Sequence, residues 1–404
     1  MDSDANIQST LIEDTFDRYL QMVGKGVDGK SGSYRRNAKR ELYNFLDWLS
    51  RESDSSGPSS GREISSPTVD DLSSSVFRGY AYHLSGDRGL QPNTVRTYYA
   101  YISSWCGWCK REDLIETHHA DTTKAKEPLP ADDNRMSGDQ QMWSSTHRNL
   151  LTRHMGKEVD DAINQIDMDE SSEAIQRARF GAMKAHRNRV LVYFLCYTGF
   201  RVGEFVRDGS DTRRSGVTWS DVSFENETLY IFRKSQKWQY ATLTKRTVEP
   251  LRLYRNRIDP PSDDWPVFPA MDNGTLSGHI QSALMARGHT ADEIEDIRDQ
   301  YFNDFFCAMD LNVTPPSITT DGVRHIMRQI TEESEVDTTK LDAEYLQPHG
   351  GRRGMGEPLF TEYGYTEAAR YLDNSEEMVR ERYSHIKPGK LGDTADDAIE
   401  NIDK

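Results

Sequence analysis

The stretch "VLVYFLCYTGFRVGEFV", residues 190–206, joins the most apolar run of the chain to an abrupt change of pattern. The run 190–197 is typical of the buried centre of a domain, and it is far too short to span a bilayer. Gly199 then allows a tight turn, and Arg201 and Glu204 follow as near neighbours at the start of a helix. An arginine directly after such a run is held rigidly at the edge of a core, which argues against an ordinary surface salt bridge.

The residues that follow this centre change from a helical to a strand pattern. Segment 223–248 has two runs of alternating apolar and polar residues around "RKSQKW", which predicts a β-hairpin. Helical spacing dominates elsewhere, including an acidic segment at 158–173 and a basic one at 177–189. Residues 258–316 are acidic, and we interpret them as an insertion to which the sequence assigns no function.

The N-terminal residues 10–115 have helical spacing throughout. One face of "RELYNFLDWL" carries the apolar stripe of a helix that packs on others, formed by Leu42, Phe45, Leu46 and Leu49. Thr68 is a predicted N-cap, and a later helix is expected to begin near Asn93 or Thr94. About four helices would then form a small bundle.

These patterns predict a mainly α fold with a small antiparallel β-sheet. A helical N-terminal domain is expected over 1–117, and a mixed α/β domain over 141–390. Between them, 118–140 has two prolines and little apolar content, which is typical of a linker. The tail 391–404 predicts either a docking helix or a frayed end, because three apolar residues recur at helical spacing: Ala398, Ile399 and Ile402.

The composition is strongly acidic for a chain of 404 residues. It has 66 acidic against 50 basic residues, a net charge of −16 and a mean hydropathy of −0.79. Net charge keeps a protein soluble when salt screens repulsion, so this favours a salt-adapted protein over an ordinary acidic one. The opening "MDSDANIQST" is acidic and polar, unlike a signal peptide, so we expect a cytoplasmic protein. An acidic total argues against indiscriminate nucleic-acid binding but leaves room for a local basic cleft.

The "WCGWC" at 105–109 has the spacing of a thioredoxin-type redox pair. That motif needs a strand before it, whereas the residues before Cys106 and Cys109 have helical spacing. Cys196 and Cys307 lie far away in the sequence, so neither a disulfide framework nor a zinc site is expected. A redox protein remains the outside alternative.

Two His-x-x-Arg pairs compete for a chemical role. One is "HIMR", with His325 and Arg328, and the other is "LQPHGGRRGMG" at 346–356, with His349 and Arg352. Pro348 disfavours helix for the residue before it and the glycines loosen the backbone, which places the second pair near a helix N-terminus, where anions bind. The residues alone leave both pairs open.

A lysine and a tyrosine could complete a phosphoryl-transfer site. Lys234 lies on the hairpin turn beside Lys237, and Tyr383 lies near the end of a helical pattern at 369–386. Taken singly, a turn lysine is usually solvated and such a tyrosine is usually a core residue. Together with two arginines and a histidine they fit attack on a phosphodiester: arginine forks clamp the extra negative charge, histidine moves a proton, lysine protonates the leaving oxygen, and tyrosine is the nucleophile.

The order arginine, lysine, His-x-x-Arg, tyrosine makes the second half of the chain resemble the tyrosine recombinases of the phage-integrase family, most closely archaeal viral or plasmid members. "TGFRVGE" resembles their first arginine box. "YIFRKSQKWQYATL" resembles their "GKGNKERLVPL" run, which selects Lys234 over Lys237. The interval from Arg352 to Tyr383, 383 − 352 = 31, is similar to the family's. Because Arg328 gives 383 − 328 = 55, "HIMR" is expected to lie on an ordinary helix without a catalytic role.

One position departs from the family pattern. The family has His or Trp nine residues before the tyrosine, within "LGHS", where this chain has "LDNS" with Asn374. An amide can still donate a hydrogen bond to a phosphate oxygen. The N-terminal runs "YRRNAKRELYNFLDWL" and "NTVRTYYAYISSWCGWCKREDLIE" resemble helices of the family's core-binding domain, so the resemblance covers most of 10–390 except 258–316.

The resemblance implies a site-specific recombinase. Tyr383 would attack a DNA phosphate to form a 3′-phosphotyrosyl link, without ATP, metal or another cofactor. Arg201, Arg352, His349 and Asn374 would hold the phosphate, Lys234 would be the general acid, and Glu204 would orient its neighbours. Expected partners are double-stranded DNA attachment sites, with a homotetramer on paired sites and accessory DNA-bending proteins as further candidates; integration of a viral genome is one outcome of such strand exchange.

Basic side chains are expected to line a positive channel for the DNA, so that the acidic ones face outward. The candidates are Arg177, Arg179, Lys184, Arg187, Arg189 and Lys237. Two alternatives to a recombinase stay open. One is a DNA-binding descendant that no longer cuts, which Asn374 suggests, and the other is a type IB topoisomerase, which would act as a monomer without paired sites.

Overall fold

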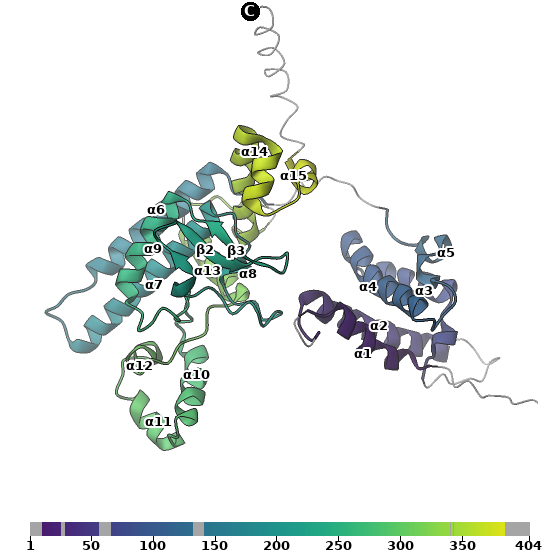
Figure 1. Ribbon diagram of the computed structural model, residues 1–404, viewed down its shortest axis with the longest axis horizontal. Helices are drawn as coiled ribbons and strands as arrows, with labels where there is room; N and C mark the ends of the chain where they lie inside the picture. The colour runs from purple at the N-terminus through teal and green to yellow at the C-terminus, as the bar shows by residue number, and fades with distance from the viewer. Residues whose placement is uncertain are drawn as a thin grey trace, which may run out of the picture. The chain divides into compact units, whose positions relative to one another are not determined.

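A computed structural model describes residues 10–25, 29–55, 66–131, 141–339, 341 and 343–383, the side chains of 52–55 and 381–383 excepted (Figure 1). The chain forms two compact units, Met1–Arg135 with Ser210–Thr212 and Met136–Gly209 with Arg213–Lys404. The tail 391–404, a predicted docking helix or frayed end, lies outside the described residues. None of the described helices has the length and apolarity that a membrane span requires.

The first unit is a small helical bundle. Its helices are α1 (Ile12–Val23), α2 (Ser33–Ser55), α3 (Ser74–Tyr82), α4 (Pro92–Arg111) and α5 (Thr123–Lys126), with the short η1 (Val69–Asp71), η2 (His83–Asp87) and η3 (His119–Asp121). The predicted stripe of α2 is confirmed, because Leu42, Phe45 and Leu49 are buried and Leu46 is half-buried. Aromatic rings dominate this core, where Phe45 contacts both Phe77 and Trp105.

Several boundaries in this unit differ from the expected ones. Thr68 caps the short η1, while Ser73 caps α3 by accepting from the Val76 N–H at 3.3 Å. Helix α4 begins earlier than expected, at Pro92, which suits the first position of a helix because it has no N–H to leave unpaired. The predicted linker starts at 118, yet Ala120 of η3 and Ala125 of α5 are buried in the bundle core.

The two cysteines of "WCGWC" lie inside α4, as their helical spacing predicts. Both side chains are buried and form no disulfide. Burial raises the pKa of the Cys106 thiol to about 11 and that of the Cys109 thiol to about 12. Neither sulfur is therefore a thiolate at neutral pH, and a redox role has no support from this geometry.

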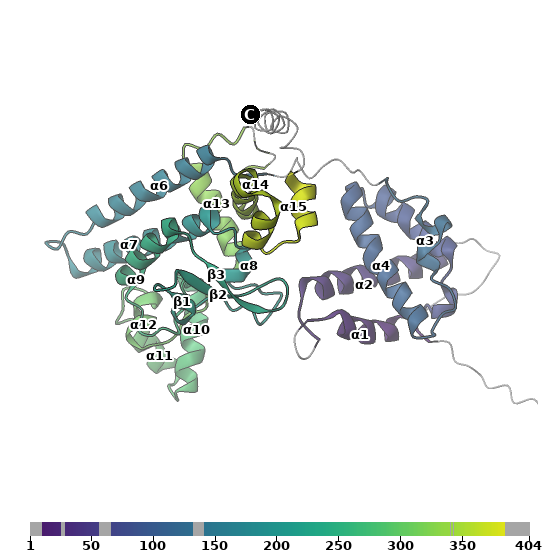
Figure 2. The ribbon, with the colours of Figure 1, turned by 45° about the horizontal axis from the view of Figure 1, so that its top comes forward.

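In the second unit, helices pack with a small sheet (Figure 2). Its elements are α6 (Ser145–Asn164), α7 (Ser172–Tyr197), α8 (Val202–Phe205), η5 (Trp219–Asp221), β1 (Val222–Ser223), β2 (Thr228–Phe232), β3 (Trp238–Thr242), α9 (Lys245–Ile258), α10 (Asn273–Ala286), α11 (Ala291–Arg298), α12 (Asp304–Asp310), α13 (Thr320–Glu333), α14 (Pro348–Leu372) and α15 (Glu376–Tyr383). The strands pair antiparallel in the order β1-β2-β3, and β2 and β3 form the predicted hairpin. The predicted mainly α fold with a small antiparallel sheet is confirmed.

Helix α7 supplies the centre of the second core. The apolar run that ends it is buried, with Val190, Leu191 and Phe194 at its heart. Leu229, Ile231 and Ala241 cover this core from the sheet, each alternating with a residue on the other face. Gly199 has a φ of 65°, which lets the chain turn sharply from α7 into α8.

The acidic segment 258–316 folds into α10, α11 and α12, which lie together in both ribbon views (Figures 1 and 2). Its buried side chains belong to the same core as α7, including Trp265, Phe268 and Phe305. The segment is therefore an integral part of the core of this unit.

Helix α14 begins at Pro348, so the expected helix N-terminus at the second His-x-x-Arg pair is confirmed. The expectation that glycines loosen the backbone there is wrong. A Cβ on Gly351 would collide with the carbonyl oxygen of Leu195, and one on Gly354 with the carbonyl of Trp143. These glycines let α14 lie directly against α7 and Trp143.

The helical pattern at 369–386 corresponds to two helices, which corrects the single helix expected there. Helix α14 ends at Leu372, Asp373 adopts a left-handed conformation with φ 49°, and α15 starts at Glu376. Asparagine and aspartate tolerate this conformation better than most residues. The break places Asn374 at the junction between the two helices.

Candidate active site

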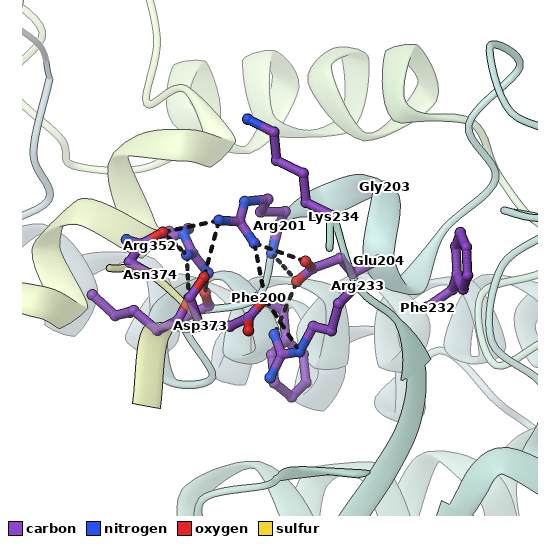
Figure 3. Close-up of polar contacts among 12 residues, drawn as sticks. Phe200, Arg201, Gly203, Glu204, Phe232, Arg233, Lys234, Arg352, Asp373 and Asn374 are labelled. Atoms are coloured by element: carbon purple, nitrogen blue, oxygen red, sulfur yellow. Dashed lines mark hydrogen bonds and ion pairs between the residues drawn. The ribbon is translucent and has the colours of Figure 1, made fainter. Parts of the chain in front are cut away.

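Four elements converge on a cluster of three arginines (Figure 3). Arg201 stands at the start of α8, Arg233 follows β2, and Arg352 lies in the second turn of α14, while the α14–α15 junction contributes Asn374. These residues are far apart in the sequence, and only the fold brings them together.

Glu204 holds two of the arginines from below the surface. Its carboxylate accepts from the Arg201 backbone N–H at 2.9 Å, from Arg201 Nη1 at 2.9 Å and from Arg233 Nη1 at 3.1 Å. Burial acts to raise the pKa of Glu204, but Arg233 and Arg201 outweigh it, so the pKa is lowered. The surface salt-bridge alternative is wrong, since the Glu204 side chain is 1% exposed.

Arg352 is the most buried of the three, at 2% exposure. Its guanidinium donates to the carbonyl oxygens of Gly199 and Leu372 and, from Nη2 at 3.0 Å, to Asn374 Oδ1. Burial, and then the neighbouring Arg201, lower the pKa of Arg352 to about 9. The group therefore stays charged at neutral pH and is fixed by backbone carbonyls.

Asn374 joins two arginines through one oxygen. Its Oδ1 accepts from Arg201 Nη2 at 2.9 Å and from Arg352 Nη2 at 3.0 Å. The amide NH₂ stays as the donor end of the side chain. Asn374 is thus part of the arginine cluster, and its expected contact with a phosphate stays a prediction.

Asp373 and Arg233 belong to the same cluster, although the sequence analysis did not select them. Asp373 Oδ2 lies 3.7 Å from Arg201 Nη1 and 4.0 Å from Arg233 Nε, which is close enough for ion pairs but too long for hydrogen bonds. Arg233 is 5% exposed and lies over the ring of Phe200. The sequence held a signal for Asp373, because "LDNS" has aspartate where the family's "LGHS" has glycine. It held none for Arg233, which resembles any other arginine on a turn.

The remaining predicted catalytic residues lie on or beside the elements that carry this cluster. Lys234 is exposed on the hairpin turn and extends away from the arginines in Figure 3. His349 is exposed in the first turn of α14. Tyr383 is the last residue of α15, and its side chain lies outside the described residues. Arg214 fixes the turn by donating to the carbonyls of Gly203 and Phe232, both at 2.8 Å.

The first His-x-x-Arg pair lies on an ordinary helix, as expected. His325 and Arg328 are exposed on α13, and the Arg328 guanidinium lies 4.7 Å from the centroid of the Tyr345 ring. Arg328 is therefore a surface residue that packs on a neighbouring aromatic ring.

The predicted DNA-binding residues have different environments. Arg177 is exposed and pairs with Glu173 at 2.7 Å, while Arg179, Lys184 and Lys237 are exposed and Arg189 is half-buried. Arg187 requires a correction, because it is buried and its Nη1 donates to the Pro269 carbonyl at 3.0 Å. A helix rotates by about 100° per residue, so a basic run of this length covers every face, including the one that faces the core.

Comparison with known proteins gives matches in structure only. No family model matches the sequence, and no curated protein matches it. The Tn1549 transposon integrase in complex with transposon right end DNA matches with a TM-score of 0.54 and 10% identity, over 98% of this chain and 100% of that one. The same integrase with a circular intermediate DNA gives 0.53 and 12%, over 98% and 100%. At this identity the likeness concerns the fold, and the fold is that of the tyrosine recombinase catalytic domain.

Proposed function

We propose that this chain is a site-specific DNA recombinase that cuts and rejoins strands through a 3′-phosphotyrosyl intermediate. The observation that carries the proposal is the bridge at Asn374, which brings the guanidinium groups of Arg201 and Arg352 to one point. That point lies at the start of the short helix that ends on Tyr383. DNA as the substrate is supported by the structurally similar integrase, which was solved with transposon DNA.

The charge of the cluster suits one phosphodiester. Arg201, Arg233 and Arg352 bring three positive charges, and Glu204 and Asp373 bring two negative ones, so the sum is 3 − 2 = +1. The groups are partly or fully buried, where charges interact more strongly than in water. A phosphate that gains negative charge in the transition state is therefore stabilised by donors that are already oriented.

In the reaction, the Tyr383 oxygen forms a bond to phosphorus while the bond from phosphorus to the 5′ oxygen breaks. The tyrosine gives up its proton, which His349 can accept, and Lys234 protonates the leaving 5′ oxygen. Arg201 and Arg352 hold the nonbridging oxygens, with the Asn374 amide beside them. The 5′ hydroxyl of a partner strand then reverses the step, which requires paired sites and is the reason to expect a tetramer.

A nicked suicide DNA substrate tests the proposal, built from repeats in the DNA that flanks the gene. We expect a covalent protein–DNA adduct on a denaturing gel, lost in Tyr383→Phe. An adduct that persists in Tyr383→Phe would rule out this nucleophile. Binding without any adduct would favour the second candidate, a non-cleaving DNA-binding protein, which Asn374 in place of the family's His or Trp supports. Relaxation of supercoiled DNA without site preference would favour a topoisomerase.

A further inference from the structure

The outer face of the β2–β3 hairpin carries aromatic side chains that the arginine cluster does not use. Leu229, Ile231 and Ala241 face the core, so the residues that alternate with them face outward. Of the three cross-strand pairs on this outer face, one is Thr228 with Thr242 and two are aromatic, Tyr230 with Tyr240 and Phe232 with Trp238. We call these residues the aromatic ladder: Tyr230, Phe232, Trp238 and Tyr240.

The rings of the ladder contact one another; Phe232 is buried and Tyr230 half-buried, while Trp238 and Tyr240 leave large ring faces in water. Tyr230 and Trp238 stack with centroids 5.2 Å apart, and Tyr230 and Tyr240 lie 4.8 Å apart. Trp238 is nevertheless 48% exposed and Tyr240 is 73% exposed. Cross-strand pairs stabilise a hairpin, but that role does not require so much exposed ring.

The surroundings of the ladder are positive, in contrast to the chain as a whole. Residues 228–246 contain no aspartate or glutamate in a protein of net charge −16. They carry five cations, Arg233, Lys234, Lys237, Lys245 and Arg246. Two further guanidinium groups, of Arg213 and Arg214, lie 4.7 and 5.2 Å from the Phe232 ring centroid. Exposed rings among cations match a polyanion that itself carries flat rings, which is the chemistry of a nucleic acid.

A groove beside the ladder adds hydrogen-bonding groups. Tyr230 and Tyr240 line it together with the hydroxyl and amide groups of Ser220, Ser223, Asn226 and Thr228 and one carboxylate, that of Asp221. Hydroxyl and amide groups at such a position can bond the edges of bases. The opposite end of the hairpin leads directly into Arg233 and Lys234, so a strand lying on the ladder continues toward the arginine cluster.

We propose that the aromatic ladder stacks on unpaired bases of DNA next to the cleaved phosphate. Bases in an intact duplex present only their edges, so ring faces are available to a protein only where the strands have separated. The inference rests on the proposed function and deepens it, because it names locally unpaired DNA as the ligand of this face. Phosphates of that strand pair with Lys234 and Lys237, while its bases stack on Trp238 and Tyr240.

Trp238 is a natural reporter for the test. Of the other tryptophans, all of which lie in the described ranges, five are buried and Trp48 is half-buried. The full chain is titrated with a single-stranded oligonucleotide, an abasic oligonucleotide of the same length, and a duplex. We expect the first to quench the fluorescence and to bind about tenfold or more tightly than the abasic strand, which has the same phosphates but no rings.

Variants separate stacking from charge. Trp238→Phe keeps a ring but removes the reporter, so quenching is lost while affinity, measured by anisotropy of a labelled strand, stays within about twofold. The double variant Trp238→Ala/Tyr240→Ala lowers affinity to the abasic level. Tyr363→Ala is the matched control, because this tyrosine of α14 is 67% exposed outside the ladder. A thermal melt verifies that each variant is folded.

Equal affinity for normal and abasic strands would overturn the inference, as would equally strong quenching by the duplex. Self-association in sedimentation that disappears in the double variant would identify the ladder as an interface between two copies of the chain instead. The Tyr383→Phe variant should quench like the wild type. Quenching without an adduct therefore refutes the proposed cleavage alone, and an adduct without quenching refutes the stacking alone.

Discussion

Helices α13 and α14 both contain a histidine followed three residues later by an arginine, but the arginine is exposed in α13 and buried in α14. In α13 the two residues between are Ile326 and Met327, which are both buried. Burying them turns His325 and Arg328 toward solvent, where they are exposed. The pattern in α13 is the polar face of an amphipathic helix.

In α14 the two residues between are Gly350 and Gly351, and the outcome is reversed for the arginine, whereas His349 is exposed like His325. Without side chains there, the helix approaches the Trp143 ring and the Leu195 carbonyl so closely that no Cβ fits. Arg352 is drawn beneath the surface to the carbonyls of Gly199 and Leu372. The residues inside a His-x-x-Arg motif therefore decide whether its arginine is a surface charge or part of a site.

The largest effect is expected when the arginine of one of the two motifs is removed. Arg352→Ala removes a preorganised charge from the phosphate site, so adduct formation should fall by about a thousandfold or more. Arg328→Ala on α13 is the matched control and should change the adduct yield by less than about twofold. Rates from the nicked suicide substrate measure both. Equal losses in the two variants would mean that the two motifs were assigned to the wrong roles.

The second prediction concerns how closely each of the two helices approaches its neighbours. Gly351→Ala forces a Cβ onto the Leu195 carbonyl, a backbone atom that cannot move alone, and should cost about 3 kcal/mol of unfolding free energy. Gly322→Ala in α13 meets the Thr319 hydroxyl at 3.4 Å and the Ile318 Cβ at 3.8 Å, which are ordinary contacts, and should be neutral or stabilise by up to about 1 kcal/mol. Urea denaturation of both variants gives the comparison. A stable Gly351→Ala protein would contradict the close approach of α14.

A smaller effect of opposite sign is expected at Asp373. Its carboxylate lies within 4.0 Å of two arginines and repels an incoming phosphate. Asp373→Asn keeps the left-handed backbone, since asparagine tolerates it, and should raise affinity for duplex DNA by about three- to tenfold at low salt. Asp321→Asn, an exposed α13 carboxylate, is the control and should have little effect. Weaker binding by Asp373→Asn would show that Asp373 organises the arginines instead of competing with the phosphate.

The smallest effect concerns pH. Because Arg233 and Arg201 lower the pKa of Glu204 in the folded protein, its ionised form stabilises the fold above its ordinary pKa. That contribution is lost as the pH falls through the lowered value. The difference in unfolding free energy between the wild type and Glu204→Gln should therefore narrow below about pH 4.5. A difference that is constant from pH 7 to pH 3 would contradict the pairing.

Local pattern predicted much of this architecture. The hairpin around Lys234, the buried run before Arg201 and the helix start at Pro348 each depend on a few adjacent residues, and each is present in the structure. Arg187 was misjudged because a charge run does not show which face of a helix turns inward. Arg233 and Asp373 were missed because their environments are created by segments far apart in the sequence, which no local periodicity encodes.

The left-handed residue Asp373 also has a mechanical consequence. Two residues separate it from α15, and within that interval Asn374 is bonded to two arginines. Asn374 thus connects the arginine cluster to α15, the helix that ends at Tyr383. In the proposed reaction, a phosphate that displaced Arg201 or Arg352 would also shift α15, so that recognition of the DNA backbone would be coupled to the placement of the tyrosine.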